Sequence, residues 1–198
     1  MITFINLRNS NPYTLFKKKY DQAIKSGQPD AQAAVISSFN KTNNEVDSRV
    51  VNIKFLESEN FIFFTNYNSP KSLAFQSHNQ IGALFYWASI NAQIRLKAKI
   101  SKTSCKFNQK YFFDRSEKKN ALAISSNQSK QINSYSQIEE NYNKSLKNDD
   151  LKKCPEYWGG FSFIPYYFEF WEGHKSRVNK REVSEKTDGV WKHSFLQP

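Results

Sequence analysis

The side chains best able to do chemistry in this sequence are cations and aromatic rings. Lys and Arg outnumber Asp and Glu by 29 to 18, giving a formal net charge of +11, and there are 17 Phe, 10 Tyr and 4 Trp. Such cations attract phosphates and other anions, and such rings fill cores or stack on flat ligands. Because the basic residues are spread along the chain, with no run of five, we expect no nucleic-acid partner. A barrel that binds single-stranded nucleic acid by aromatic stacking is kept only as an alternative.

The motifs of the commonest catalytic sites are absent. The six glycines form no GxGxxG and no P-loop, so side chains and scattered amides must hold any phosphate. His78, His174 and His193 are separated from one another and from Cys105 and Cys154, which form no CxxC pair, so we expect no metal site. GxSxG is also missing. An enzyme built on this chain is therefore expected to rely on a bound cofactor.

The length of the chain fits one domain. Without repeats or an interdomain linker, residues 1–198 are predicted to form a single domain, in which residues 1–28 make a helical amino-terminal segment. No stretch approaches the ~18 apolar residues that a membrane span needs. Two cysteines far apart in sequence fit a reducing compartment better than a disulfide scaffold. We therefore expect a soluble, unprocessed, cytoplasmic protein without a membrane partner.

The amino-terminal half predicts one helix and then an antiparallel meander. Asn11 and Pro12 are typical of a helix start, apolar residues follow at helical spacing, and Gly27 marks the end. Runs rich in β-branched and aromatic residues are separated by turn-forming residues. They predict three strands joined by hairpins, at residues 33–39, 48–56 and 61–66.

A second helix and two further strands are predicted in the middle of the chain. Ser69 and Pro70 mark the helix start, and the strands cover residues 81–87 and 92–100. The second strand alternates strictly between apolar and polar residues, so one of its faces must lie on a core. Gln93 opens the polar face of this strand.

The carboxyl-terminal half predicts two helices and at least two strands. The helices cover residues 106–114 and 136–146, and Ser136 opens a capping box at the start of the second. The polar stretch between them has no assigned structure. Asp188 and Gly189 are a strong signal for a type I' hairpin. About six short strands with interspersed helices and no βαβ alternation predict an α+β fold with a closed or partly closed barrel.

Several segments, taken in order, resemble the pyridoxamine 5'-phosphate oxidase family. They are SRVVNIK, FFTNYNSPK, the strand that starts at Gln93, residues 111–115, Gln128 with Ser129, and WGGF followed by EFWEG and RVNKR. The match runs from about residue 11 to residue 198. The resemblance implies an antiparallel split β-barrel with flanking helices, of the FMN-binding type. It also implies a homodimer whose active sites are shared between the subunits.

The resemblance implies which side chains hold FMN. Arg49 and Lys71 match positions that bind the FMN phosphate, and cations suit a dianion where no glycine loop exists. Trp171 and Arg181 match residues that reach the flavin ring from the partner subunit. Taken alone, these residues would be interpreted as surface charges or, for Trp171, as a core aromatic. The full implied cofactor set is Arg49, Val50, Lys54, Phe64, Thr65, Lys71, Gln93, Gln128, Ser129, Trp171 and Arg181.

The resemblance also implies a substrate and a reaction. Pyridoxamine or pyridoxine 5'-phosphate would be oxidised to pyridoxal 5'-phosphate by hydride transfer to FMN, and molecular oxygen would then be reduced to hydrogen peroxide. Arg177 and Asn179 match the catalytic positions. The full implied substrate set is Lys54, Tyr111, Arg115, Lys119, Arg177 and Asn179.

Four positions depart from the family pattern. Phe64 replaces a Tyr, Pro70 replaces a second phosphate-binding Arg, Lys119 replaces a Ser, and Asn179 replaces a His. Losing one charge-assisted phosphate contact costs ~1.5–3 kcal/mol unless a neighbour compensates. An Asn cannot carry a proton at neutral pH as a His can. These departures keep an alternative open, namely a non-catalytic or altered-specificity protein of the same fold that binds flavin or a vitamin phosphate.

Overall fold

The computed structural model describes residues 1–198, which contain one ten-stranded sheet. Its strands are β1 (Thr3–Ile5), β2 (Ala33–Asn40), β3 (Glu45–Asn52), β4 (Phe55–Glu57), β5 (Asn60–Asn66), β6 (Gln80–Trp87), β7 (Ala92–Lys102), β8 (Trp158–Glu172), β9 (Lys180–Thr187) and β10 (Val190–Leu196). Their order in the sheet is β1-β4-β5-β8-β7-β6-β2-β3, while β9 also pairs with β8, and β10 pairs with β9. Only β1 and β4 pair in parallel.

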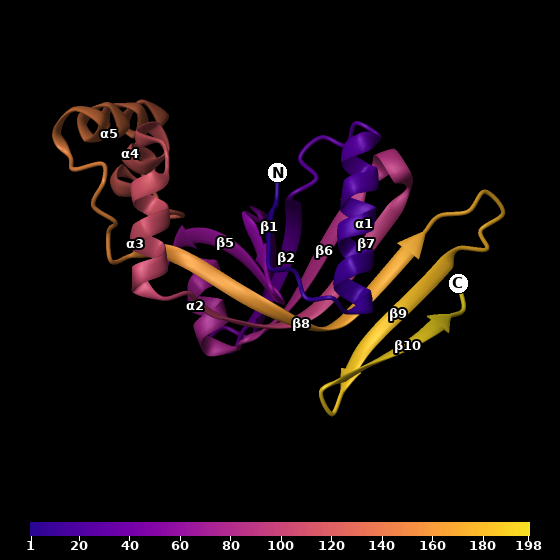
Figure 1. The fold of residues 1–198 in the computed structure, drawn as a ribbon. Coiled ribbons are helices and arrows are strands. Elements are labelled where there is room, and N and C mark those ends of the chain that lie inside the picture. Colours follow the sequence, from indigo (N-terminus) through magenta and orange to yellow (C-terminus); the bar gives the residue numbers. More distant parts are fainter.

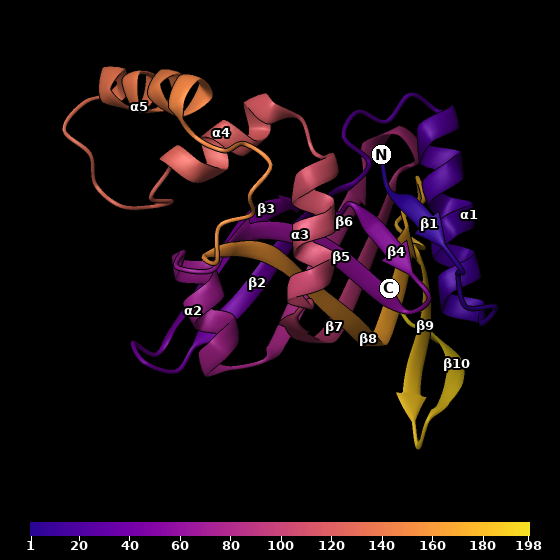
Figure 2. The same ribbon diagram turned by 60° about the vertical axis from the view of Figure 1, so that its left-hand side comes forward.

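The helices lie around this sheet and at one end of it. They are α1 (Asn11–Lys25), α2 (Pro70–Ser77), the 3-10 helix η1 (Ala88–Ile90), α3 (Cys105–Asp114), α4 (Glu117–Ser125) and α5 (Tyr135–Asn148). The long strand β8 leads from the region of α3 to the hairpin of β9 and β10 (Figure 1). Helices α4 and α5 pack on each other and stand away from the sheet (Figure 2). The fold therefore has a helical end and a hairpin end, joined by β8.

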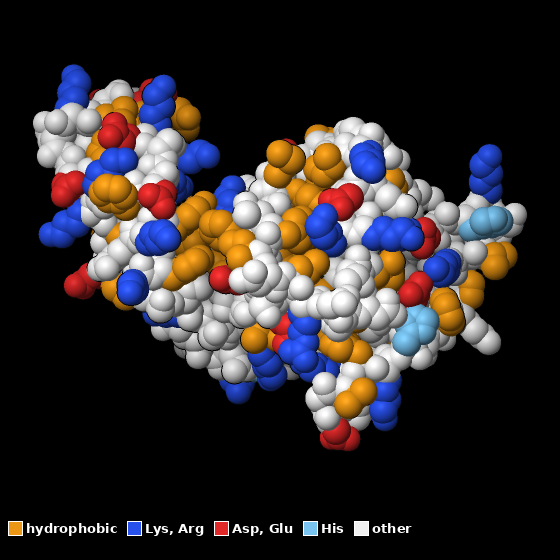
Figure 3. All heavy atoms as spheres, viewed as in Figure 1, with side chains coloured by type: hydrophobic (Ala, Val, Ile, Leu, Met, Phe, Trp, Pro, Cys, Tyr) orange, Lys and Arg blue, Asp and Glu red, His pale blue; other side chains and the backbone are white.

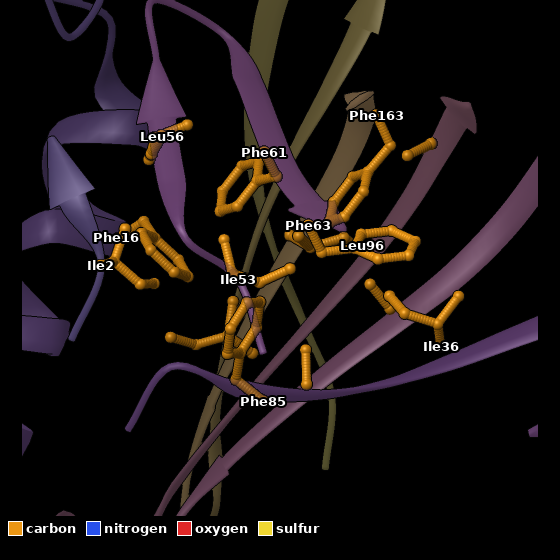
Figure 4. Close-up of a cluster of buried hydrophobic side chains, with 14 of the residues drawn as sticks. Ile2, Phe16, Ile36, Ile53, Leu56, Phe61, Phe63, Phe85, Leu96 and Phe163 are labelled. Carbon is orange, nitrogen blue, oxygen red and sulfur yellow. The ribbon is translucent and has the colours of Figure 1, made fainter. Parts of the chain in front are cut away.

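A single aromatic core fixes the strands that approach the helical end. Phe16 of α1 meets Phe61 of β5 edge-on, with ring centroids 5.0 Å apart, and Phe61 stacks on Phe163 of β8 at 5.1 Å. These rings belong to a cluster of 26 buried residues, part of which is drawn in Figure 4. Each aromatic pair contributes about 0.5–1.5 kcal/mol beyond the burial of its surface. The packing makes β5 and β8 a rigid support for side chains at their ends.

Several local predictions are confirmed. Helix α1 begins at Asn11 and ends before Gly27, whose φ of +76° suits a glycine, and α2 begins at Pro70. Strand β7 alternates between buried apolar and more exposed polar residues as predicted. Asp188 and Gly189 have φ values of +51° and +79°, as a type I' hairpin turn requires.

The prediction of one continuous strand at residues 48–56 was wrong, although the antiparallel hairpins on either side of it, β2 with β3 and β4 with β5, form as predicted. The Ile53 N–H donates to the carbonyl of Gln32, next to β2, at 3.0 Å, whereas the Lys54 N–H donates to the carbonyl of Ile62 in β5 at 2.7 Å. The backbone thus changes its sheet partner between two adjacent residues. Strand β3 pairs with β2 at one edge of the sheet, and β4 pairs with β5 nearer the other. Local alternation cannot reveal a switch that depends on distant partners.

Three smaller expectations also needed correction. The unassigned polar stretch contains α4, and the amino-terminal strand β1 was not predicted. Helix α5 starts one residue before Ser136, with Ser134 as its cap, whose Oγ accepts a hydrogen bond from the Gln137 N–H at 3.3 Å. A Ser-x-x-Gln pattern is also a capping box, so two overlapping patterns competed, and the earlier one forms the cap.

The surface charges agree with the dispersed pattern of the sequence. On the face shown in Figure 3, Lys and Arg side chains are scattered over the helical end, the body and the hairpin end. None of the helices combines the length and the hydrophobicity needed to cross a membrane.

Candidate functional site

A cavity of 410 Å³ opens at the helical end of β8, where β3, β5, α2 and α3 meet. No Asp or Glu lines it. A hollow of 230 Å³ shares Phe64, Thr65 and Arg115 with it and continues to Trp158. We call the cavity-lining residues, together with the adjacent Arg49, the cavity cluster. The lining residues are Val50, Val51, Asn52, Lys54, Phe64, Thr65, Lys71, Tyr111, Arg115, Lys119 and Gln128.

Arg49 and Lys71 form one positive group of the cavity cluster. The guanidinium of Arg49 donates to Ser38 Oγ of the neighbouring strand at 2.8 Å. The Lys71 ammonium, in the first turn of α2, donates to the hydroxyls of Thr65 at 3.1 Å and Ser69 at 3.2 Å. Burial, and then the charge of Arg49, lowers the pKa of Lys71 to about 8. A doubly charged anion is the ligand that such a pair attracts most strongly.

Lys54, Arg115 and Lys119 form a second positive group in the same cavity. Burial, followed by the charges of Lys119 and Arg115, lowers the pKa of Lys54. The Arg115 guanidinium donates to the Lys119 carbonyl at 3.0 Å and to Asn120 Oδ1 at 3.3 Å, and it lies 5.0 Å from the centre of the Trp158 ring. Because these cations repel one another, an anion bound among them would be strongly favoured.

An aromatic stack forms one wall beside these cations. Phe64 stacks on Tyr111, with ring centroids 3.9 Å apart, and on Trp158 at 5.2 Å. Burial raises the pKa of Tyr111, so its hydroxyl remains protonated and can donate a hydrogen bond. Phe64 offers an apolar face without the hydroxyl that a Tyr would add. The wall suits a flat ring held close to the second positive group.

Gln128 reaches the cavity, whereas Ser129 does not line it. Gln128 Oε1 accepts from the Thr65 hydroxyl at 3.1 Å and from the Asn66 N–H at 3.3 Å, which ties the segment after α4 to β5. Ser129 has a φ of +68° and lines a separate hollow between α4 and α5. The adjacent pair therefore serves two different surfaces in this chain.

Two glycines at the start of β8 allow α3 to dock on the sheet. A Cβ on Gly159 would lie 2.2 Å from the hydroxyl oxygen of Tyr67, and one on Gly160 would lie 2.6 Å from Thr103 Oγ1. The Gly160 N–H donates to Asn108 Oδ1 of α3 at 2.9 Å. Only glycine permits this approach, which directs the side chains of α3 toward the cavity.

A second set of predicted residues lies at the hairpin end, and we call it the hairpin cluster: Gln93, Trp171, Arg177, Asn179 and Arg181. Gln93, Trp171 and Arg181 lie in register across β7, β8 and β9. All three side chains are half-buried. Across a sheet such neighbours are close enough to present one continuous surface to a ligand.

The guanidinium of Arg181 is oriented by a buried carboxylate. Arg181 Nε donates to Glu169 Oε1 at 2.9 Å, and Glu169 also pairs with Arg95 and accepts from the Tyr167 hydroxyl at 2.9 Å. Burial alone would raise the pKa of Glu169, but the hydrogen bonds from Arg95, Tyr167 and Arg181 outweigh burial and lower it. Glu169 therefore stays ionised and holds Arg181 in place.

Arg177 and Asn179 lie in the turn between β8 and β9. Asn179 Oδ1 accepts from the His174 N–H at 3.0 Å, which leaves its amide NH₂ free to donate. Arg177 has a φ of +63°, and its side chain is exposed to solvent. Neither side chain contacts the cavity cluster.

The cavity cluster and the hairpin cluster lie at opposite ends of β8. Gly159 pairs with Thr65 of the cavity, and Trp171, which is 171 − 159 = 12 residues later, pairs with Gln93 and Arg181. At about 3.3 Å per residue, this length of strand spans roughly 40 Å. One chain therefore does not bring its two clusters together.

Sequence reasoning missed two residues that shape the cavity. Asn120 is fully buried, and its Nδ2 donates to the carbonyls of Phe112 and Leu151, both at 2.8 Å, while its Oδ1 accepts from Arg115. It lies in the stretch without an assigned structure, so no local pattern marked it. Trp158 stood in the WGGF segment but had no assigned role; an aromatic residue beside paired glycines was the available signal.

Comparisons with known proteins identify the family. A model described as the pyridoxine 5'-phosphate oxidase C-terminal dimerisation region matches residues 158–198. The pyridoxine/pyridoxamine 5'-phosphate oxidase of Herminiimonas arsenicoxydans is 31% identical over 191 residues, which is 96% of this chain and 90% of that protein. The chain belongs to the pyridoxine/pyridoxamine 5'-phosphate oxidase family. The family member from Legionella pneumophila strain Paris is 33% identical over 191 residues, covering 96% of this chain and 88% of that one.

Solved structures show the same fold. PhzG from Burkholderia lata 383, in complex with tetrahydrophenazine-1-carboxylic acid, has a TM-score of 0.90 at 23% identity and covers 96% of this chain and 93% of its own. A pyridoxamine 5'-phosphate oxidase-related, FMN-binding protein from Nostoc punctiforme has a TM-score of 0.77 at 13% identity, covering 92% of this chain and 97% of its own. The predicted α+β split barrel of the oxidase family is confirmed.

Proposed function

We propose that this oxidase-family chain is an FMN-dependent oxidase that converts pyridoxamine or pyridoxine 5'-phosphate to pyridoxal 5'-phosphate. One observation carries the proposal: four cations, Lys54, Lys71, Arg115 and Lys119, line one cavity whose lining contains no carboxylate, and Arg49 adds its charge beside Lys71. Of these five cations only Arg49 pairs with a carboxylate, that of the exposed Asp47 outside the cavity lining, so the five together require anionic ligands. A cofactor phosphate on one group and a substrate phosphate on the other would satisfy both.

The residues present fit FMN. Arg49 and Lys71 would bind its phosphate, and the Thr65 hydroxyl, which now accepts from Lys71, lies beside that position. Gln128, bound to Thr65, supplies an amide at the same wall. When bound, FMN supplies the acceptor for a hydride from the aminomethyl or hydroxymethyl carbon of the substrate, and molecular oxygen takes up the two electrons to give hydrogen peroxide.

The second positive group fits the substrate. Lys54, Arg115 and Lys119 would hold the phosphate, and the Tyr111 hydroxyl can donate to the same group. The planar guanidinium of Arg115 is fixed by two hydrogen bonds, so it can present two donors to a phosphate without losing further freedom. These contacts would orient the substrate and leave its reacting carbon to face the flavin.

The hairpin cluster would complete the site from a second copy of the chain. Within one chain this cluster lies roughly 40 Å of strand away from the cavity, and the matched dimerisation region, residues 158–198, contains most of it. In a two-fold homodimer each cavity can receive the partner's hairpin residues. Trp171 and Arg181 would then face the flavin, and Arg177 and Asn179 the substrate. A guanidinium beside the flavin would stabilise the negative charge of its reduced form.

Asn179 favours a second candidate, a protein that binds flavin and the vitamin phosphate with little turnover. Its carbonyl oxygen is held by the His174 N–H, so only the NH₂ group can face a ligand, and no proton can be exchanged at neutral pH. The absence of a second phosphate-binding Arg at Pro70 points the same way.

An anaerobic half-reaction separates the two candidates. The purified chain is reconstituted with FMN, free flavin is removed, and the visible absorbance of the bound flavin is followed after adding each 5'-phosphate. Bleaching with either substrate is the result expected of the oxidase, with pyridoxine lacking phosphate as the control. Flavin that binds but stays oxidised would favour the binding protein, and failure to bind FMN would overturn both.

A further inference from the structure

Asp47 is an acidic residue that forms an ion pair with Arg49 and whose charge also acts on Lys71. It lies two residues before Arg49 on the edge strand β3, and its Oδ2 is 2.6 Å from Arg49 Nη2. The Asp47 side chain is 69% exposed, whereas that of Arg49 is 16% exposed. Asp47 is therefore the solvent-exposed partner of this ion pair, and Arg49 is the more buried one.

Arg49 does not need Asp47 to hold its position. Its Nη1 donates to Ser38 Oγ at 2.8 Å and to the Ile36 carbonyl at 3.1 Å, and Ser38 is itself buried. These contacts come from β2, the paired neighbour of β3. The pairing with Asp47 uses a different nitrogen, Nη2. Asp47 thus accepts a hydrogen bond from an Arg49 N–H group that a bound phosphate would otherwise use.

The influence of Asp47 extends to Lys71. The Lys71 ammonium has hydroxyl partners and no carboxylate within hydrogen-bond distance. The negative charge of Asp47 raises the pKa of Lys71 against the larger effects of burial and Arg49. In return, the pKa of Asp47 is lowered chiefly by the hydrogen bond from Arg49 and also by the charge of Lys71. One carboxylate therefore serves two cations.

We propose that Asp47 is an internal counter-ion that stands in for the cofactor phosphate in the flavin-free protein and weakens phosphate binding by competing for Arg49. The identity of the ligand as FMN rests on the proposed function. A bound phosphate must displace Asp47 from Arg49 or lie beside its negative charge, and either cost lowers affinity. The flavin-free chain gains charge balance, and the cofactor becomes exchangeable.

Flavin binding to the flavin-free protein tests the proposal. FMN and riboflavin are titrated separately, and quenching of flavin fluorescence gives Kd for the wild type and for Asp47→Asn. Glu45→Gln is the matched control, because Glu45 is an exposed carboxylate on the same strand that is bound only by Asn43. The expected result is FMN affinity on the order of tenfold tighter in Asp47→Asn, with riboflavin affinity unchanged and Glu45→Gln within about twofold of wild type.

Inorganic phosphate gives a readout that needs no flavin. Thermal unfolding is compared in sodium phosphate and in sodium chloride of the same ionic strength. Without phosphate, Asp47→Asn should melt below wild type, because Arg49 and Lys71 then repel each other without a counter-ion. Phosphate should raise its Tm by more than it raises that of wild type.

The outcomes separate this proposal from the proposed function. FMN affinity that is unchanged or weaker in Asp47→Asn, together with equal phosphate shifts, would overturn the counter-ion role while leaving flavin binding intact. If the wild type binds neither flavin, the proposed function fails. The phosphate comparison then decides the role of Asp47 alone.

Discussion

The separation of the two clusters along β8 makes a complementation experiment decisive. Lys54→Gln damages only the cavity cluster, and Arg177→Asn damages only the hairpin cluster, with Asn chosen because it tolerates the positive φ at residue 177. Each change removes a charge-assisted contact worth about 1.5–3 kcal/mol. Each homodimer should therefore lose roughly tenfold to a hundredfold in kcat/KM.

The activity of the mixture follows from the geometry. If each site takes its cavity from one chain and its hairpin residues from the other, a heterodimer of the two variants has one site with both changes and one with neither. Random exchange makes about half of the dimers heterodimers, so about a quarter of all sites are intact. The mixture should then recover roughly a quarter of wild-type activity, well above either variant alone.

Peroxide production with pyridoxine 5'-phosphate provides the assay, and differently tagged chains verify that the subunits have exchanged. A chain carrying both changes, mixed equally with wild type, is the control. Shared sites leave about a quarter of sites intact in that mixture, whereas sites within single chains leave about half. If the subunits of the two single variants have exchanged and the mixture is still no more active than the average of the two variants, the shared site is refuted.

Three further outcomes are expected. Lys71 has a pKa of about 8 in the free protein and must be protonated to bind phosphate, so FMN affinity should fall above pH 8 by up to about tenfold per pH unit. Fluorescence titration of Lys71→Arg should show no such fall. Asn120→Ala leaves the buried carbonyl of Phe112 and the partly buried carbonyl of Leu151 unpaired, so urea unfolding should show a loss of about 2–4 kcal/mol in the free energy of unfolding. A loss no larger than that of the exposed Asn127→Ala would contradict this. Asn179→His should raise the rate of flavin reduction by roughly tenfold or more, and stopped-flow absorbance showing no change would remove Asn179 as the cause of slow turnover.

The sign of the Lys71 effect also applies to the stability of the flavin-free protein. Its pKa is lower in the folded chain than the ordinary value of 10.5, so between about pH 8 and 10.5 the unfolded chain holds more of the proton. Taken by itself, this group therefore makes the free energy of unfolding rise with pH across that window. Stability and cofactor affinity should thus change in opposite directions as Lys71 loses its proton.

The features that could be predicted from the sequence are those that local chemistry controls. Proline and glycine set the bounds of α1, strict alternation gave the faces of β7, and Asp188 with Gly189 specified the last hairpin. The ordered segments also indicated the family, which the comparisons show. These signals are readable because each depends on the backbone preferences of a few neighbouring residues.

The other features depend on contacts between distant parts of the chain. The backbone changes sheet partner between Ile53 and Lys54 because hydrogen bonds to Gln32 and Ile62 compete there, and no local pattern records that competition. The same contacts between distant segments gather Lys54 and Lys71 around one cavity. They also keep Trp171 away from this cavity, because roughly 40 Å of strand β8 separates the two.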